Sequence, residues 1–247
     1  MDGDTIWMMA VAIAFVAVFV VLIRSGAKAE QRFKDALSEM AAARGWIVNH
    51  ETFGKGRGFV VTPADGGDWS LEVRRRQSSR STGAGGRTTG SSSPGRSEFR
   101  VPDPALPGGL AVFMPGSRDG AEGAAFGEAA SSIMGLFDNS FGRAMLGRLL
   151  GPDMGEHVGA LQSFPSPPGS GLQVLATADP SLWFDLAAIG RTLAGWQPSG
   201  RMEAPPQMIV GEAGLRIMVP RELSNAEAVA QMVDVGLALR ACAARRR

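Results

Sequence analysis

The longest apolar run of the chain lies near its beginning. Residues 6–23 (IWMMAVAIAFVAVFVVLI) are 18 consecutive apolar residues, and no helical or strand period gives them a polar face. As a helix, the run would be about 27 Å long, which matches the hydrocarbon core of a bilayer. The pattern therefore predicts a transmembrane anchor over residues 1–25.

A cleaved signal peptide is the main alternative for this run. Residues 27–29, Ala-Lys-Ala, resemble the small-residue site at which such a peptide is cut. The residues before the run are acidic (Asp2 and Asp4), whereas a signal peptide begins with positive charge, and Arg24 follows the run directly. These features favour an anchor that stays on the chain.

The charges beside the run predict how it crosses the membrane. No Lys or Arg precedes it, and four follow it closely: Arg24, Lys28, Arg32 and Lys34. Because cytoplasmic flanks carry the excess of Lys and Arg, we expect the N-terminus outside and everything after residue 23 in the cytoplasm. The prediction is a single-pass protein of the cell inner (plasma) membrane that contacts the lipid bilayer through residues 6–23.

A helix is expected directly after the anchor. Residues 26–45 have a helix-forming composition, and Phe33, Leu37 and Met40 fall on one face of the expected helix. Gly45 is typical of the position just past a helix end. We interpret this segment as a stalk or as the first helix of the following domain.

Residues 46–160 have the pattern of a β-rich part. Residues 69–75 alternate apolar and polar side chains, which is the period of a half-buried strand. Residues 77–97 consist almost wholly of Ser, Thr, Gly and Arg, and we interpret them as a mobile loop at a hairpin tip. Apolar residues at helical spacing within 122–150 predict one broken helix or two short ones. Further strands are expected at 46–48, 59–62, 99–101 and 110–113.

Residues 161–247 predict the order strand, helix, hairpin, helix. The strand is expected at 172–177, and Asp179 followed by Pro180 predicts the start of a helix that runs to Ala194. The hairpin is expected to pair residues 208–210 with residues 215–219.

The terminal helix is expected to open at a capping box, Ser224 to Glu227. Its predicted apolar side carries Val229, Met232, Val233 and Leu237. Together these elements predict an α+β fold: an N-terminal transmembrane helix followed by a soluble domain of antiparallel hairpins packed with several helices. The sequence leaves open whether residues 46–160 and 161–247 form one domain or two.

Composition excludes several classes of protein and site. The 25 basic and 24 acidic residues give a net charge of +1, which excludes a strongly basic nucleic-acid binder as a description of the whole chain. A single cysteine, Cys242, excludes an intramolecular disulfide and a multi-cysteine metal site. The two histidines, His50 and His157, stand apart from any metal-ligand or catalytic motif. We predict no catalytic residue, no metal and no cofactor, and the sequence favours a non-enzymatic role.

Positive charge is concentrated in one segment. Residues 72–100 carry seven arginines and two acids, and residues 101–239 carry seven basic and fourteen acidic groups. Beside a bilayer, such a segment attracts anionic lipid, at about 1 kcal/mol per charge near the surface. Nucleic acid is disfavoured as a partner because the segment lacks the interleaved aromatic residues of single-strand binders. The alternative is that this segment is a solvated loop whose charges bind no partner. The predicted contacts with anionic lipid or a partner are Arg74, Arg75, Arg76, Arg80 and Arg87.

Three segments of the chain resemble bacterial single-pass membrane proteins of unknown function. They are the anchor, GFVVTPADGGDWSLE at residues 58–72 and PPQMIVGEAGLRIMV at residues 205–219. The resemblance implies an anchored α+β domain that closes with a hairpin and a helix, and it implies no activity. Two hypotheses for the function remain. The first is a membrane-tethered cytoplasmic interaction or regulatory domain that binds a protein partner or anionic lipid. The second is a small-molecule-binding or enzymatic domain with a pocket between the two α+β parts.

Overall fold

The computed structural model describes residues 25, 28–53, 56–82, 88–93, 95–102, 109–115, 157, 159–197 and 205–244. The predicted anchor at 6–23 and the predicted helices at 122–150 lie outside these residues. Among the helices that the structure describes, none is both long enough and apolar enough to cross a membrane.

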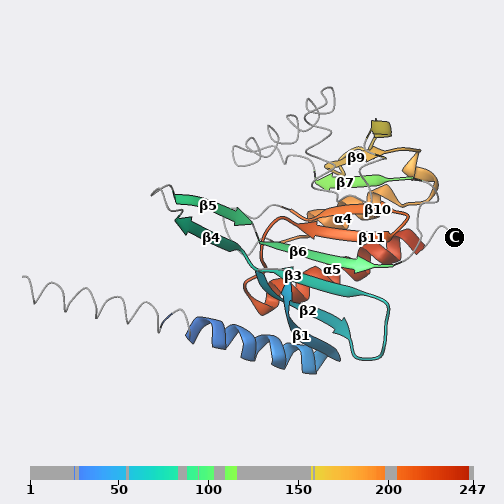
Figure 1. Cartoon of the computed structure of the whole chain (residues 1–247). Helices are drawn as coiled ribbons and strands as arrows, with labels where there is room; N and C mark the ends of the chain where they lie inside the picture. Colours follow the sequence, from blue (N-terminus) through green and yellow to red (C-terminus); the bar gives the residue numbers. More distant parts are fainter. Residues whose placement is uncertain are drawn as a thin grey trace, which may run out of the picture.

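Nine strands form one sheet in which every neighbouring pair is antiparallel (Figure 1). The sheet confirms the predicted α+β class and its antiparallel hairpins. In spatial order the strands are β1 (Trp46–Phe53), β2 (Gly56–Pro63), β3 (Ser70–Arg74), β6 (Arg96–Val101), β11 (Gly214–Val219), β10 (Gln207–Gly211), β7 (Ala111–Pro115), β9 (Leu172–Ala176) and β8 (Gln162–Phe164).

The hairpin of β10 and β11 lies in the middle of this sheet. It was expected from the sequence, and its strands pair from Gln207 opposite Met218 to Gly211 opposite Gly214. β11 also pairs with β6, and β10 pairs with β7. Strands from residues 46–115 and from residues 162–219 therefore belong to a single sheet.

Three helices cover one face of the sheet: residues 28–44, α4 (Leu186–Ala194) and α5 (Ala226–Ala244). The first was predicted; Leu37 is buried in the core, and Gly45 ends the helix with φ +66°. α5 lies very close to β6, because a Cβ added at Gly236 would be only 2.5 Å from the Phe99 ring. Glycine is therefore required where this helix crosses the sheet.

Two helix starts differ from the prediction. Asp179 caps only a short 3-10 helix, Pro180–Leu182, after which the chain turns to bury Phe184 against Phe113. α4 then starts at a second cap, Asp185, whose carboxylate accepts the backbone N–H of Ala188 at 3.0 Å.

The terminal helix also starts one residue later than expected, at Ala226, because its cap is not the first residue of the predicted capping box. Asn225, and not Ser224, caps α5, because its Oδ1 accepts the backbone N–H of Ala228 at 2.6 Å. Along the same helix, Leu237 was expected on the apolar side, but it is exposed and Leu239 is buried instead.

The segment predicted as a loop over residues 77–97 is mostly regular. β4 (Gln77–Thr82) pairs with β5 (Thr88–Ser93) in a separate two-stranded sheet, which we call the β4–β5 hairpin. Ser97 already belongs to β6 and is buried, with its hydroxyl donating to the carbonyl of Arg221 at 2.8 Å. In Figure 1 the hairpin projects beyond the nine-stranded sheet.

The sheet face opposite the described helices, here called the outer face, has two halves. On β7, β9, β10 and part of β11, apolar side chains form a second, smaller buried cluster that includes Val112, Leu175 and Ile209. On β3, β6 and the rest of β11, most outward positions are charged. The charged half contains Glu98, which is buried although it is charged.

Candidate functional site

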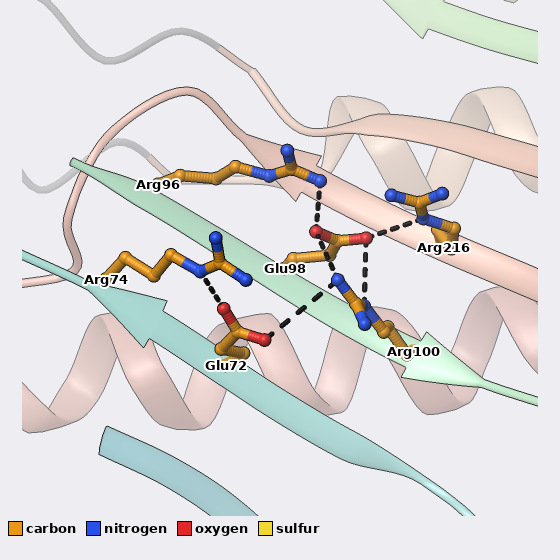
Figure 2. A network of polar contacts seen from close by, with 6 residues as sticks. All are labelled: Glu72, Arg74, Arg96, Glu98, Arg100 and Arg216. Carbon is orange, nitrogen blue, oxygen red and sulfur yellow. Dashed lines mark hydrogen bonds and ion pairs between the residues drawn. The ribbon is translucent and has the colours of Figure 1, made fainter. Parts of the chain in front are cut away.

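Six charged side chains on three adjacent strands form what we call the arginine–glutamate network (Figure 2). They occupy alternate positions, so they share the outer face while their neighbours point into the core. Glu72 lies opposite Glu98, Arg74 lies opposite Arg96, and Arg100 lies opposite Arg216. The members are Glu72, Arg74, Arg96, Glu98, Arg100 and Arg216.

Glu98 is the centre of the network. Its side chain is only 3% exposed, and three arginines surround the carboxylate. Arg216 Nε lies 2.5 Å from Oε1, and Arg100 Nη2 donates to Oε2 at 3.1 Å. Arg96 donates to the same Oε2. Each oxygen of this buried carboxylate is therefore bound by guanidinium, which offsets the cost of removing the charge from water.

The environment of Glu98 strongly favours its ionised form. Burial raises the pKa, but the hydrogen bond from Arg100 and the positive charges of Arg96, Arg216 and Arg100 outweigh burial and lower the pKa from 4.5 to about 2. Glu98 is consequently a fixed negative charge at physiological pH. It positions the arginines and does not exchange protons.

Glu72 and Arg74 extend the network onto β3. Arg74 donates to the carboxylate of Glu72, and its guanidinium also lies 5.1 Å from the centre of the Phe53 ring, a cation–π distance. Arg100 connects the two carboxylates, because its Nη2 is 4.0 Å from Glu72 Oε2. Side chains of β3 and β1, Glu72 and Phe53, thus help to orient guanidinium groups of the network.

The network has more positive than negative charge. Four arginines face two glutamates, and the side chains of Arg96, Arg100 and Arg74 remain 31%, 42% and 49% exposed. Guanidinium is a planar, permanently charged donor that binds oxyanions through paired N–H groups. Both carboxylates are held by guanidinium groups, so neither is placed as a free nucleophile, and the network is a set of mutually oriented charges.

A second charged cluster lies at the base of the β4–β5 hairpin. Arg75 Nη1 is 3.0 Å from Glu30 Oε1, near the start of the helix of residues 28–44, and Arg75 Nε is 3.4 Å from Glu222 Oε1. The backbone N–H of Arg76 donates to Glu222 Oε2 at 3.3 Å. Hydrogen bonds from Lys34 and Arg75 lower the pKa of Glu30. This cluster joins the hairpin base to the first described helix.

The five arginines predicted as contacts do not form one surface. Arg74 faces outward in the arginine–glutamate network, whereas Arg75 points to the helix side. Arg76 is exposed beside the hairpin, Arg80 lies in β4, and Arg87 lies outside the described residues.

Sequence reasoning missed the other five members of the network: Glu72, Arg96, Glu98, Arg100 and Arg216. The available signal was the strand RSEFRV, in which charged residues alternate with core residues, and the single arginine within GLRIMV.

Other candidate chemistry is sparse. In the described part of the chain, no three His, Cys, Asp or Glu side chains are placed to hold a metal ion. His50 is exposed and lies edge-on to Phe59, and Cys242 is buried in α5. An open depression of about 290 Å³ between α4 and α5 is lined by three alanines together with Arg191, Thr192 and Cys242, and it offers few polar groups to orient a ligand.

No family model, curated protein or solved structure matches the chain. The two charged clusters are therefore the basis for assigning a function.

Proposed function

We propose that the protein is a membrane-tethered cytoplasmic interaction domain whose β4–β5 hairpin contacts anionic lipid headgroups. In this proposal residues 6–23 cross the inner membrane once, with the N-terminus outside. The observation that supports it is the contact between Arg75 and Glu30, which links the base of the basic hairpin to the helix that follows the apolar run.

The chain length between these features limits their separation. Glu30 is seven residues after Ile23, so the two Cα atoms are at most about 25 Å apart in any conformation. Arg75 lies beside Glu30, and β4 begins two residues later, at Gln77. Figure 1 shows the hairpin on the same side of the molecule as the start of the helix of residues 28–44. An anchor at 6–23 would therefore hold the hairpin close to the bilayer surface.

The charge of the hairpin is suited to that position. Residues 73–97 contain no acidic residue. Arg74 and Arg75 are paired with carboxylates, so we assign most of the attraction to Arg76, Arg80 and Arg87. At about 1 kcal/mol for each charge near an anionic surface, they would contribute about 3 kcal/mol, decreasing with salt.

This function has more support than a small-molecule site between residues 46–160 and 161–247. Strands from both segments alternate within one sheet, which favours a single body over two parts with a pocket between them. A protein partner for the hairpin remains as an outcome of the test below.

The test uses the full chain in lipid nanodiscs. With Cys242→Ala removing the native thiol, a fluorophore attached through Ser91→Cys reports contact with quencher-labelled lipid. We expect strong quenching in discs with anionic lipid at low salt and weak quenching in purely zwitterionic discs. Arg80→Gln with Arg87→Gln removes about 2 kcal/mol of attraction and should reduce the contact about thirtyfold.

The matched control removes two arginines away from the hairpin, Arg44→Gln with Arg191→Gln, and should leave quenching unchanged. Equal quenching in both lipids, or equal losses in the two double variants, would exclude lipid contact and favour a protein partner or a solvated hairpin. Orientation is tested separately with a cytoplasm-specific reporter after Arg247, which we expect to be active. Release of residues 30–247 as a soluble fragment would contradict the anchor.

A further inference from the structure

We propose that the protein forms a symmetric dimer in which β1 pairs antiparallel with β1 of a second copy, so that two nine-stranded sheets become one. β1 is the last strand on one side of the sheet (Figure 1). The proposal does not depend on the membrane contact proposed above. It rests on the free edge of β1, on the regularity of that edge, and on the side chains that a two-fold axis brings together.

The backbone of β1 has one bonded edge and one free edge. Gly45 and Ala64 lie opposite each other beside the β1–β2 ladder, and the Ala64 N–H donates to the Gly45 carbonyl at 2.8 Å. The Arg75 N–H donates to the Arg57 carbonyl at 2.9 Å, which fits the same alternation on the other side of β2. Because bonded pairs alternate along an antiparallel ladder, the odd-numbered residues of β1 bond to β2. The even-numbered residues direct their backbone groups to the other edge, where no described residue forms a hydrogen bond with them: Trp46, Val48, His50 and Thr52.

This free edge is long and regular. β1 pairs with β2 over eight consecutive positions without a bulge, and it contains neither proline nor lysine, which proteins commonly use to block edge pairing. The strand at the opposite side of the sheet, β8, has only three residues. Ile47, on the outer face of β1, is 45% exposed, and it is one of three large apolar side chains that are exposed in the described part of the chain. Such an edge is suited to a further strand.

A two-fold axis at His50 aligns the free backbone groups of two copies. Only the even-numbered residues carry such groups, so they must oppose one another. With this axis, His50 lies opposite His50 and Val48 lies opposite Thr52 of the second copy, and each pair exchanges two backbone hydrogen bonds. These pairs give about six bonds in total. Because the same surface is used on both copies, the contact closes as a dimer and does not continue as a filament.

The side chains on the outer face are complementary in this register. Ile47 lies opposite the half-buried Phe53 of the second copy, and Asn49 lies opposite Glu51, whose carboxylate accepts amide hydrogens. Each contact occurs twice. An axis at Asn49 would place Ile47 opposite Glu51, and an axis at Glu51 would place two carboxylates opposite each other. The self-complementary pattern therefore favours a second copy as the occupant, with the axis at His50.

The first experiment crosslinks single cysteines on β1 in the full chain, with Cys242→Ala removing the native thiol, in zwitterionic vesicles under mild oxidation. His50→Cys should form a disulfide-linked dimer, because opposite residues of a bonded pair have Cα atoms about 5.5 Å apart, within disulfide reach. Asn49→Cys alone should crosslink little, because its two copies are diagonal neighbours about 7–8 Å apart. A mixture of Asn49→Cys and Glu51→Cys chains should crosslink to each other. Glu212→Cys, in the exposed β10–β11 turn, measures chance collisions.

The second experiment measures the dimer by sedimentation of the full chain in mild detergent. His50→Pro removes an N–H that points to the free edge, so the ladder between β1 and β2 keeps its hydrogen bonds. The substitution should weaken dimerisation at least about tenfold, because two hydrogen bonds at the axis are lost. The matched control, His50→Ala, keeps the backbone donor and should dimerise like the unaltered chain. Circular dichroism checks that each variant is folded.

A pair of charge substitutions guards against an effect of proline on folding. Asn49 and Glu51 are exposed, so changes at Asn49 leave the core intact. Asn49→Lys should tighten the dimer severalfold by facing Glu51 of the second copy, and Asn49→Glu should weaken it severalfold. Three results would each overturn the proposal: a monomer at every concentration, a His50→Cys yield no higher than that of Glu212→Cys, or equal effects of Asn49→Lys and Asn49→Glu.

Discussion

The buried carboxylate of Glu98 gives the strongest prediction for stability. Glu98→Gln keeps the size of the side chain and removes its charge, which leaves Arg96, Arg100 and Arg216 close together without their shared anion. Removing one partner of a buried ion pair is far more destabilising than removing an exposed one, because the remaining charges stay desolvated. The variant should therefore be clearly less stable at neutral pH.

The pKa of Glu98 sets the magnitude and the pH range. The folded-state pKa of about 2 lies below the ordinary value of 4.5. A difference of this size corresponds to about 3 kcal/mol of folding stability at neutral pH. Because the folded-state value is the lower one, the contribution is complete above about pH 4.5 and is lost as the pH falls through about 2. The stability difference between the native chain and Glu98→Gln should shrink over the same range.

Urea unfolding of the full chain in mild detergent, followed by tryptophan fluorescence, measures this difference. Trp69 is a suitable probe, because its ring stacks at 5.6 Å on Phe99, the neighbour of Glu98 in β6. Glu212→Gln in the exposed β10–β11 turn is the matched control and should change stability by less than about 0.5 kcal/mol. A double-mutant cycle with Arg216→Gln should give a coupling energy above about 1 kcal/mol.

Two results would refute this account of Glu98. One is a loss of stability in Glu98→Gln no larger than that of the Glu212→Gln control. The other is a loss that stays constant from pH 7 to pH 3, which would show that the substitution disturbs packing and not an ionised carboxylate.

Three further predictions concern the fold. Gly236→Ala should destabilise the protein by about 1–3 kcal/mol in urea unfolding, because the added methyl group would overlap the Phe99 ring, and an unchanged midpoint would contradict the close approach of α5. Asn225→Ala should lower the free energy of unfolding by about 1 kcal/mol and Ser224→Ala by much less, since only the former removes the cap of α5. The reverse order in urea unfolding would show that Ser224 is the cap, as the sequence predicted. Replacing the β4–β5 hairpin by a short Gly-Ser link should leave the melting temperature nearly unchanged, because the hairpin forms its own sheet, and a large decrease would show that it packs on the core.

Local patterns in the sequence predicted the elements better than their arrangement. The β10–β11 hairpin and the helix of residues 28–44 were predicted because apolar period and turn glycines act within a few residues. Nothing local indicates that β11 pairs with β6, where the contact between Arg216 and Glu98 joins residues 118 positions apart. The start of a helix is also hard to predict to the residue. Ser224 and Asn225 are both suitable N-cap residues, and the fold uses Asn225.

The arginine–glutamate network was hidden for a related reason. In a single strand, alternating charge normally indicates a face in contact with water. Glu98 becomes buried only when β3 and β11 bring further arginines to both sides of β6, which the sequence of β6 cannot show. Counting charge over residues 72–100 identified the region, but it grouped arginines that point to opposite faces of the sheet.

The central place of the β10–β11 hairpin has a consequence for how the chain is made. The ribosome has synthesised β6 and β7 by residue 115. Their partner strands, β11 for β6 and β10 for β7, are added only about a hundred residues later. Until then both strands expose unpaired backbone edges, which are the usual starting points of aggregation. The nascent chain is therefore most vulnerable between the synthesis of β7 and that of β11, and folding should proceed as a late, largely all-or-none step once the hairpin emerges.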